Sequence, residues 1–164
     1  MGTEIFGLVK FLLGYVIPPL LDRPEVEISH SSGSRAQYGQ PTTLEWHDQV
    51  TFHNPSGFNA YRLALLCPTA GPPFLGLSLP RRHLGATEAT STPFTARLQL
   101  ATGATSPPGV SLHDHFAPPV FRSFQIVLEY RNRTGKRFYT HFIKQLDGQV
   151  TCTYHPWRKP RVAR

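Results

Sequence analysis

The sequence predicts a mainly β protein, an antiparallel β-sandwich of about seven strands preceded by one N-terminal hydrophobic helix. Short runs in which apolar and polar residues alternate recur along the chain, as in strands with one face in a core. The 16 prolines and 13 glycines lie mostly between those runs, which argues against a helical bundle. Residues 5–21 form an apolar stretch of a different kind, with a single charge.

That stretch, apolar except for Lys10, predicts a membrane anchor over residues 1–22. At about 1.5 Å per residue, a helix of this length is just long enough to cross a thin hydrocarbon layer. The stretch lacks the small-residue cleavage site and the basic start of a signal peptide. A helix at the membrane interface and a helix packed on the β domain are the alternatives. The anchor residues would be Ile5, Phe6, Leu8, Val9, Phe11, Leu12, Leu13, Val16 and Ile17.

Residues 23–156 are predicted to be the β domain, and its first part contains four strand regions. Alternation is clear around residues 26–30, 44–52, 60–67 and 93–102. Between the last two regions, residues 68–80 are rich in proline and glycine and predict a loop.

The last part of the domain predicts a three-stranded meander over residues 124–130, 137–143 and 150–154. Residues 132–135 and the Asp147-Gly148 dipeptide supply its two turns. About seven short strands separated by turns indicate an immunoglobulin-like sandwich or a small barrel. We expect much of the core to come from Trp46, Phe52, Tyr61, Leu63, Leu65, Leu98, Phe124, Ile126, Leu128 and Phe138.

Three stretches carry a resemblance to known proteins: "DRPEVEI", "VTFHNPSGFNAYRLAL" and "FQIVLEYRNRTGKRFYT". Their turn glycines and strand alternation resemble a loose class of small, uncharacterised, mostly bacterial proteins with a hydrophobic N-terminal segment and an immunoglobulin-like sandwich. The resemblance covers most of residues 22–155. It implies the fold and carries no information about an activity.

The formal net charge of +7 and a pI near 9.9 favour association with anionic partners. Part of the charge lies on the predicted meander, and part lies on a basic tail at residues 157–164. The tail also contains an aromatic residue, Trp157, so it could contact lipid headgroups or nucleic acid. A disordered, soluble tail without a specific ligand is the alternative, and nucleic acid is not favoured as a partner. The candidate anion contacts are Arg158, Lys159, Arg161 and Arg164.

One pair of side chains is suited to a metal, His113 and His115. On a strand, positions i and i+2 project to one face, so both rings could share an ion if His141 or His155 approached. This pair defines the alternative of a soluble, metal-binding β-barrel enzyme. The other interpretation is that His113 and His115 lie in a loop and bind no metal. We adopt it and assign no metal or cofactor.

The sequence contains no Gly-x-Ser-x-Gly elbow and no glycine-rich phosphate loop, so we identify no catalytic residue and expect a non-enzyme. The acidic residues are scattered, and we expect them to be solvated; Glu45 and Asp48 are the closest pair on a strand. Cys67 and Cys152 are expected to be buried free thiols, although opposed strands could pair them. Residues 132–134 match the N-glycosylation acceptor pattern.

The expected function is therefore that of a membrane-associated, non-catalytic module, an adaptor, sensor or accessory protein. Its partners would be the lipid bilayer and an unidentified protein. Arg23 and Arg35 closely follow the apolar stretch, whereas no arginine precedes it. The positive-inside tendency therefore places the β domain on the cytoplasmic side, unless Lys10 reverses the orientation.

Overall fold

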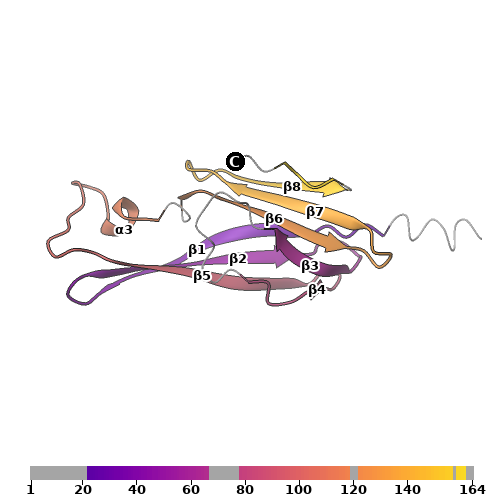
Figure 1. Ribbon diagram of the computed structural model, residues 1–164, viewed down its shortest axis with the longest axis horizontal. Helices are drawn as coiled ribbons and strands as arrows, with labels where there is room; N and C mark the ends of the chain where they lie inside the picture. Colours follow the sequence, from indigo (N-terminus) through magenta and orange to yellow (C-terminus); the bar gives the residue numbers. More distant parts are fainter. Residues whose placement is uncertain (1–21, 67–77, 119–121, 157, 162–164) are drawn as a thin grey trace, which may run out of the picture.

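The computed structural model describes residues 22–66, 78–118, 122–156 and 158–161. Its strands form two antiparallel sheets that face each other (Figure 1). The three-stranded sheet contains β1 (Glu27–Tyr38), β2 (Thr43–His53) and β5 (Ala89–Gln99), in the order β1-β2-β5. The five-stranded sheet has the order β4-β3-β6-β7-β8 and contains β3 (Ala60–Leu66), β4 (His83–Leu84), β6 (Phe124–Arg131), β7 (Arg137–Lys144) and β8 (Val150–Pro156).

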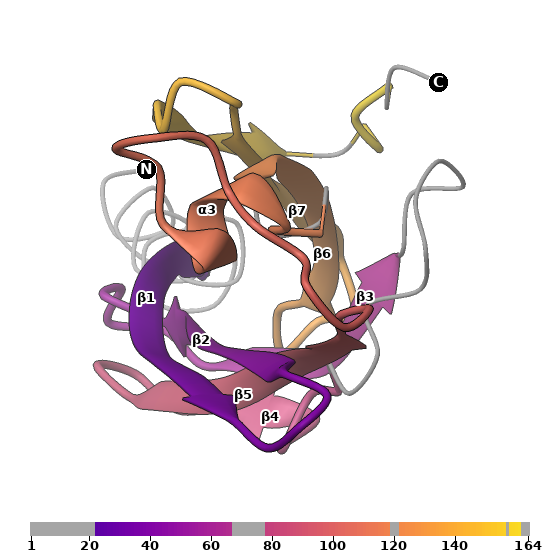
Figure 2. The same cartoon turned by 90° about the vertical axis from the view of Figure 1, so that its left-hand side faces the viewer.

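Figure 2 looks along the strands and shows the two sheets on opposite sides of a common interior, which confirms the predicted mainly β, two-layer architecture. The meander is confirmed, because β6 pairs with β7 and β7 pairs with β8 in antiparallel register. The two-residue strand β4 was not predicted, since two residues carry no alternation. A short helix, α3 (Leu112–His115), lies between β5 and β6.

The hydrophobic helix that we expect over residues 1–22 falls, apart from Asp22, outside the described residues, and all nine anchor residues fall there too. Within the described ranges, no helix has the length and apolar character needed to cross a membrane.

The space between the sheets is filled by inward-facing side chains of both layers. Trp46 and Phe52 on β2 are 1% and 0% exposed. Leu65 and Leu98 are only partly buried, at the border of the core. Seven of the ten predicted core residues are buried, namely Trp46, Phe52, Leu63, Phe124, Ile126, Leu128 and Phe138.

Tyr61 is the predicted core residue that was placed wrongly. The backbone of Arg62 has a φ of 52°, and the register of β3 against β6 shifts between Tyr61 and Ala64. This bulge inserts an extra residue, so Ala60 and Leu63 face the core in place of Tyr61. The ring of Tyr61 instead packs against His83, with ring centroids 5.0 Å apart.

Replacing Phe52 by alanine should lower the free energy of unfolding by about 3–5 kcal/mol, because loss of the ring leaves a cavity in the core. Urea unfolding of the full-length chain, followed by circular dichroism, measures this change. Leu146→Ala is the control; Leu146 is 76% exposed in the turn between β7 and β8, so the change should stay below about 0.5 kcal/mol. A loss below about 1 kcal/mol for Phe52→Ala would contradict the described core.

Candidate functional site

The turn between β6 and β7 is organised by Asn132, which is only 2% exposed. Its side-chain Oδ1 accepts hydrogen bonds from Thr134 Oγ1 at 2.8 Å and from the N–H of Lys136 at 2.9 Å. Gly135 has a φ of 84°, in the left-handed region that favours glycine, and its N–H donates to the Asn132 carbonyl at 3.0 Å. The turn chemistry of residues 132–135 thus produces a rigid, closed turn.

The same asparagine holds the start of the described chain. Asn132 Nδ2 donates to the carbonyl of Asp22 at 2.9 Å, and the N–H of Arg133 donates to Asp22 Oδ2 at 3.3 Å. Four residues further on, the carbonyl of Val26 accepts a hydrogen bond of 2.6 Å from Thr140 Oγ1 inside the sandwich. Residues 22–26 are therefore fixed to the five-stranded sheet at both ends.

A pocket of about 610 Å³ opens beside this turn, and four arginines line it. Three separate parts of the chain meet there. The register pairs Tyr61 with Arg131 and with His83, which brings β3, the end of β6 and the residues before β4 together. We call this the arginine pocket; it is lined by Tyr61, Arg62, Arg82, Arg131, Asn132, Arg133, Thr134 and Gly135.

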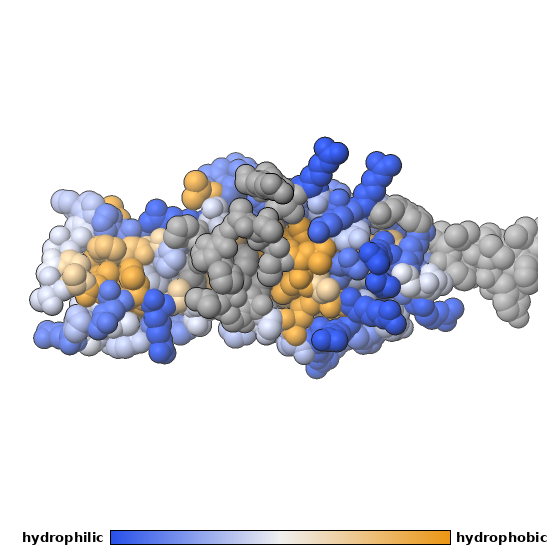
Figure 3. All heavy atoms as spheres, in the orientation of Figure 1, coloured by the Kyte–Doolittle hydropathy of each residue, from blue (hydrophilic) through white to orange (hydrophobic). Residues whose placement is uncertain are grey.

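The positive charge of the arginine pocket is weakly compensated. Arg131 Nη2 lies 3.8 Å from Glu129 Oε1, and the same oxygen lies 3.7 Å from Arg137 Nε, so two arginines share one carboxylate. Within the described residues, the guanidinium groups of the pocket's other three arginines, Arg62, Arg82 and Arg133, form no ion pair. Figure 3 shows hydrophilic residues gathered at this end of the molecule. Guanidinium groups arranged in this way can bind phosphate or carboxylate groups through paired N–H donors.

Two other features lie at the same end of the sandwich. Pro156, the last residue of β8, pairs with Phe138 at the start of β7, so the basic tail begins here. Phe58, in the loop between β2 and β3, is 41% exposed. Of the predicted anion contacts, Arg158, Lys159 and Arg161 are exposed, and Arg164 lies outside the described residues, as does Trp157.

His113 and His115 lie on the short helix α3, where positions i and i+2 do not face each other, so the strand arrangement that a shared metal ion would require is absent. His113 Nε2 lies 2.9 Å from the carbonyl oxygen of Ala36, and its ring packs edge-on against Trp46. In the part of the chain that the structure describes, no group of three or more histidine, cysteine or acidic residues could hold a metal ion. Within the described residues, the structure therefore does not bring His113 and His115 together with a third metal ligand such as His141 or His155.

Cys152 is a half-buried free thiol on β8 that packs against the core. Burial raises the pKa of this thiol, which keeps it protonated and unreactive at neutral pH. Its expected partner, Cys67, lies outside the described residues.

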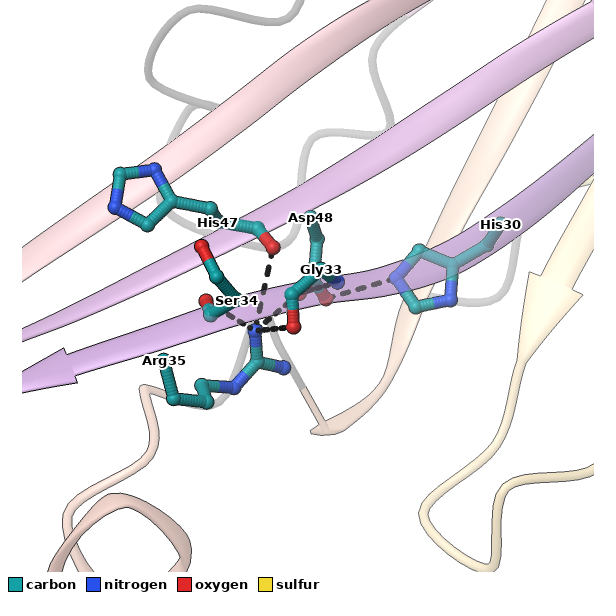
Figure 4. Close-up of polar contacts among 6 residues, drawn as sticks. All are labelled: His30, Gly33, Ser34, Arg35, His47 and Asp48. Atoms are coloured by element: carbon teal, nitrogen blue, oxygen red, sulfur yellow. Dashed lines mark hydrogen bonds and ion pairs between the residues drawn. The ribbon is translucent and has the colours of Figure 1, made fainter.

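A buried carboxylate, Asp48, is the centre of a polar network between β1 and β2 (Figure 4). Asp48 Oδ1 accepts hydrogen bonds from Arg35 Nη1 at 2.6 Å and from the N–H of Gly33 at 3.3 Å. His30 Nε2 lies 2.9 Å from Asp48 Oδ2, and since an ionised carboxylate only accepts, this nitrogen is the donor. A Cβ on Gly33 would lie 2.1 Å from the carbonyl oxygen of His47, so only glycine fits there.

We expected the acidic residues to be solvated, and for Glu45 and Asp48 this was wrong. Asp48 is 2% exposed, and Glu45 is also buried, where its carboxylate bonds Tyr38 and pairs with Arg97. Burial by itself would raise the pKa of Asp48, but the hydrogen bonds from His30 and Arg35 and the charge of Arg35 outweigh it and lower the pKa. The contacts of Asp48 and the hydrogen bond from Tyr38 to Glu45 join β1 to β2, and the pair of Glu45 with Arg97 joins β2 to β5.

Asp48→Asn should destabilise the fold by about 1–3 kcal/mol at neutral pH, because it removes the ionised acceptor that binds the buried ring of His30, the N–H of Gly33 and the guanidinium of Arg35. The folded-state pKa of Asp48 is lowered, so the ionised carboxylate stabilises the fold above its ordinary pKa, and this contribution is lost as the pH falls through the lower, folded-state value. The gap in unfolding free energy between the native chain and Asp48→Asn should therefore narrow below about pH 4.

Urea unfolding across the pH range measures this gap. Asp147→Asn is the matched control, because Asp147 is exposed in the turn before β8 and asparagine suits that turn equally. A gap for Asp48→Asn that stays constant, or widens, as the solution is acidified would show that the carboxylate does not supply the stabilisation.

No protein-family model, no curated protein and no solved structure gives a significant match to this chain. The proposal that follows therefore depends on the geometry described above.

Proposed function

We propose that this chain is a membrane-associated, non-catalytic module, an adaptor, sensor or accessory domain that residues 5–21 attach to a bilayer. The observation that carries the proposal is the attachment of Asp22. Asp22 follows the apolar stretch directly and is bound by Asn132 and Arg133 at the β6–β7 turn. A sandwich joined to an anchor without a flexible linker is held in one orientation relative to the surface.

The strand order supports an immunoglobulin-like form of this module. The hairpin of β1 and β2 lies in one sheet, where β5 returns beside β2, whereas β3, β6 and β7 belong to the other sheet. Immunoglobulin-like sandwiches distribute their strands between two sheets in the same way, with crossovers of the Greek-key type. Such domains commonly serve as binding modules, although the fold alone assigns no ligand.

A role in binding rather than catalysis is supported by the structural hydrogen bonds that the Asp48 carboxylate makes. The Asp48 carboxylate, which has the His–Asp geometry of some active sites, is occupied by Arg35 and the Gly33 N–H as well as by His30. It therefore serves the packing of β1 on β2. The competing enzyme class would gain if metal analysis of the purified protein found stoichiometric zinc or iron that His113→Ala/His115→Ala removed.

The full-length chain should sediment with membranes and require detergent for release. Leu12→Asp/Val16→Asp in the full-length chain should move it to the soluble fraction, because a charge near the centre of a spanning helix costs roughly 3 kcal/mol per residue. Fractionation followed by immunoblotting measures the distribution.

Thr105→Asp/Gln145→Asp is the matched control, because it adds the same two charges at exposed loop positions. If the native chain is soluble without detergent, the anchor is wrong, and residues 5–21 lie at an interface or pack on the domain. Protease treatment of sealed vesicles of known orientation tests on which side of the membrane the β domain lies. Cleavage from the outer side alone would show that the expected cytoplasmic location is wrong, while the membrane attachment would still hold.

A further inference from the structure

We propose that the arginine pocket is a binding site for the phosphate of an anionic lipid headgroup. This inference depends on the proposed membrane attachment and extends it, by giving the membrane-proximal end of the sandwich a specific lipid contact. It concerns four arginines that come from three separate parts of the chain and that no sequence motif connects.

The position of the pocket points to lipid. Asn132 and Arg133, which line the pocket, also bind Asp22, the residue that follows the apolar stretch. If residues 5–21 are in a bilayer, the β6–β7 turn lies at the level of the headgroups. Exposed Phe58 and the start of the basic tail after Pro156 are at the same end, which gives the surface the apolar and cationic groups that suit an interface.

The charge of the pocket points to an anion of limited size. The carboxylates closest to it are occupied: Glu129 is shared by two arginines, and Asp22 Oδ2 accepts the N–H of Arg133. The side chains of Arg82 and Arg133 are exposed and unpaired within the described residues, so a phosphate can bind without displacing an ion pair. A pocket of about 610 Å³ beside a turn suits one headgroup better than a polynucleotide, which needs an extended basic groove with stacking aromatic side chains.

The test is calorimetric titration of the full-length protein in a neutral detergent with headgroups that lack acyl chains. Glycerophosphoglycerol should bind at a single saturable site. Arg82→Gln/Arg133→Gln should weaken that binding about tenfold for each guanidinium removed, which is the effect of losing one charge-assisted hydrogen bond. Glycerophosphocholine should bind more weakly, because its quaternary ammonium is repelled by the neighbouring arginines.

Thr105→Asp/Gln145→Asp is the charge-matched control. It lowers the net charge by the same two units at exposed positions beyond the ends of β5 and β7, at the opposite end of the sandwich, and should change the affinity by less than about twofold. Circular dichroism of both double variants checks that each retains the fold.

Three results would overturn the proposal. Absence of saturable binding by glycerophosphoglycerol removes the site. Inorganic phosphate binding as tightly as glycerophosphoglycerol shows a site for free phosphate instead of lipid. Tighter binding of a DNA or RNA oligonucleotide at the same salt concentration assigns the pocket to nucleic acid.

These outcomes are separate from failure of the proposed function. A chain that fractionates as soluble but binds glycerophosphoglycerol lacks the anchor and keeps the site. A chain that requires detergent but binds no headgroup keeps the anchor and loses the site.

Discussion

A single buried asparagine links the three features from which a function can be argued. Asn132 uses its side-chain oxygen to close the β6–β7 turn through Thr134 and Lys136, and its side-chain nitrogen to hold the carbonyl of Asp22. An unsatisfied buried amide would cost about 1–3 kcal/mol, so the turn, the start of the domain and the wall of the arginine pocket are stabilised together. Because the amide nitrogen is occupied inside the protein, the acceptor pattern at residues 132–134 is poorly placed for glycosylation.

The positive charge of Arg35 and that of the arginine pocket are compensated to different degrees. In the three-stranded sheet, the partly exposed guanidinium of Arg35 pairs with the buried carboxylate of Asp48, which also accepts the N–H of Gly33, and these contacts hold β1 on β2. At the β6–β7 turn, Arg131 of the arginine pocket lies 3.8 Å from Glu129, and the other arginines of the pocket form no ion pair within the described residues. Uncompensated charge at one end raises the local concentration of anions, and in our proposal it orients the domain toward an anionic surface. The first arrangement contributes to stability, and we propose that the second contributes to recognition.

The alternation of apolar and polar residues predicted much of the fold, but it could not predict contacts between residues that are distant in the sequence. The meander was predictable, because β6, β7 and β8 alternate regularly and their turns carry Gly135 and Gly148 at positive φ. Tyr61 was misplaced, because the bulge at Arg62 changes the face without changing the residue types. The positive charge of the β6–β7 hairpin was evident from the sequence. That Arg82 lies beside this hairpin could not be predicted, because it depends on the pairing of β3 with β4 and β6.

The orientation of the sandwich on a bilayer is the central claim, and a depth measurement tests it most directly. Single cysteines at positions 58 and 105, in a chain with the native cysteines replaced by alanine, can carry a fluorophore that is quenched by brominated lipids. These positions lie beyond opposite ends of strands of eleven residues, about 35 Å apart along the strand direction. The account predicts strong quenching at position 58 and none at position 105. Equal quenching at both positions, or stronger quenching at position 105, would contradict it.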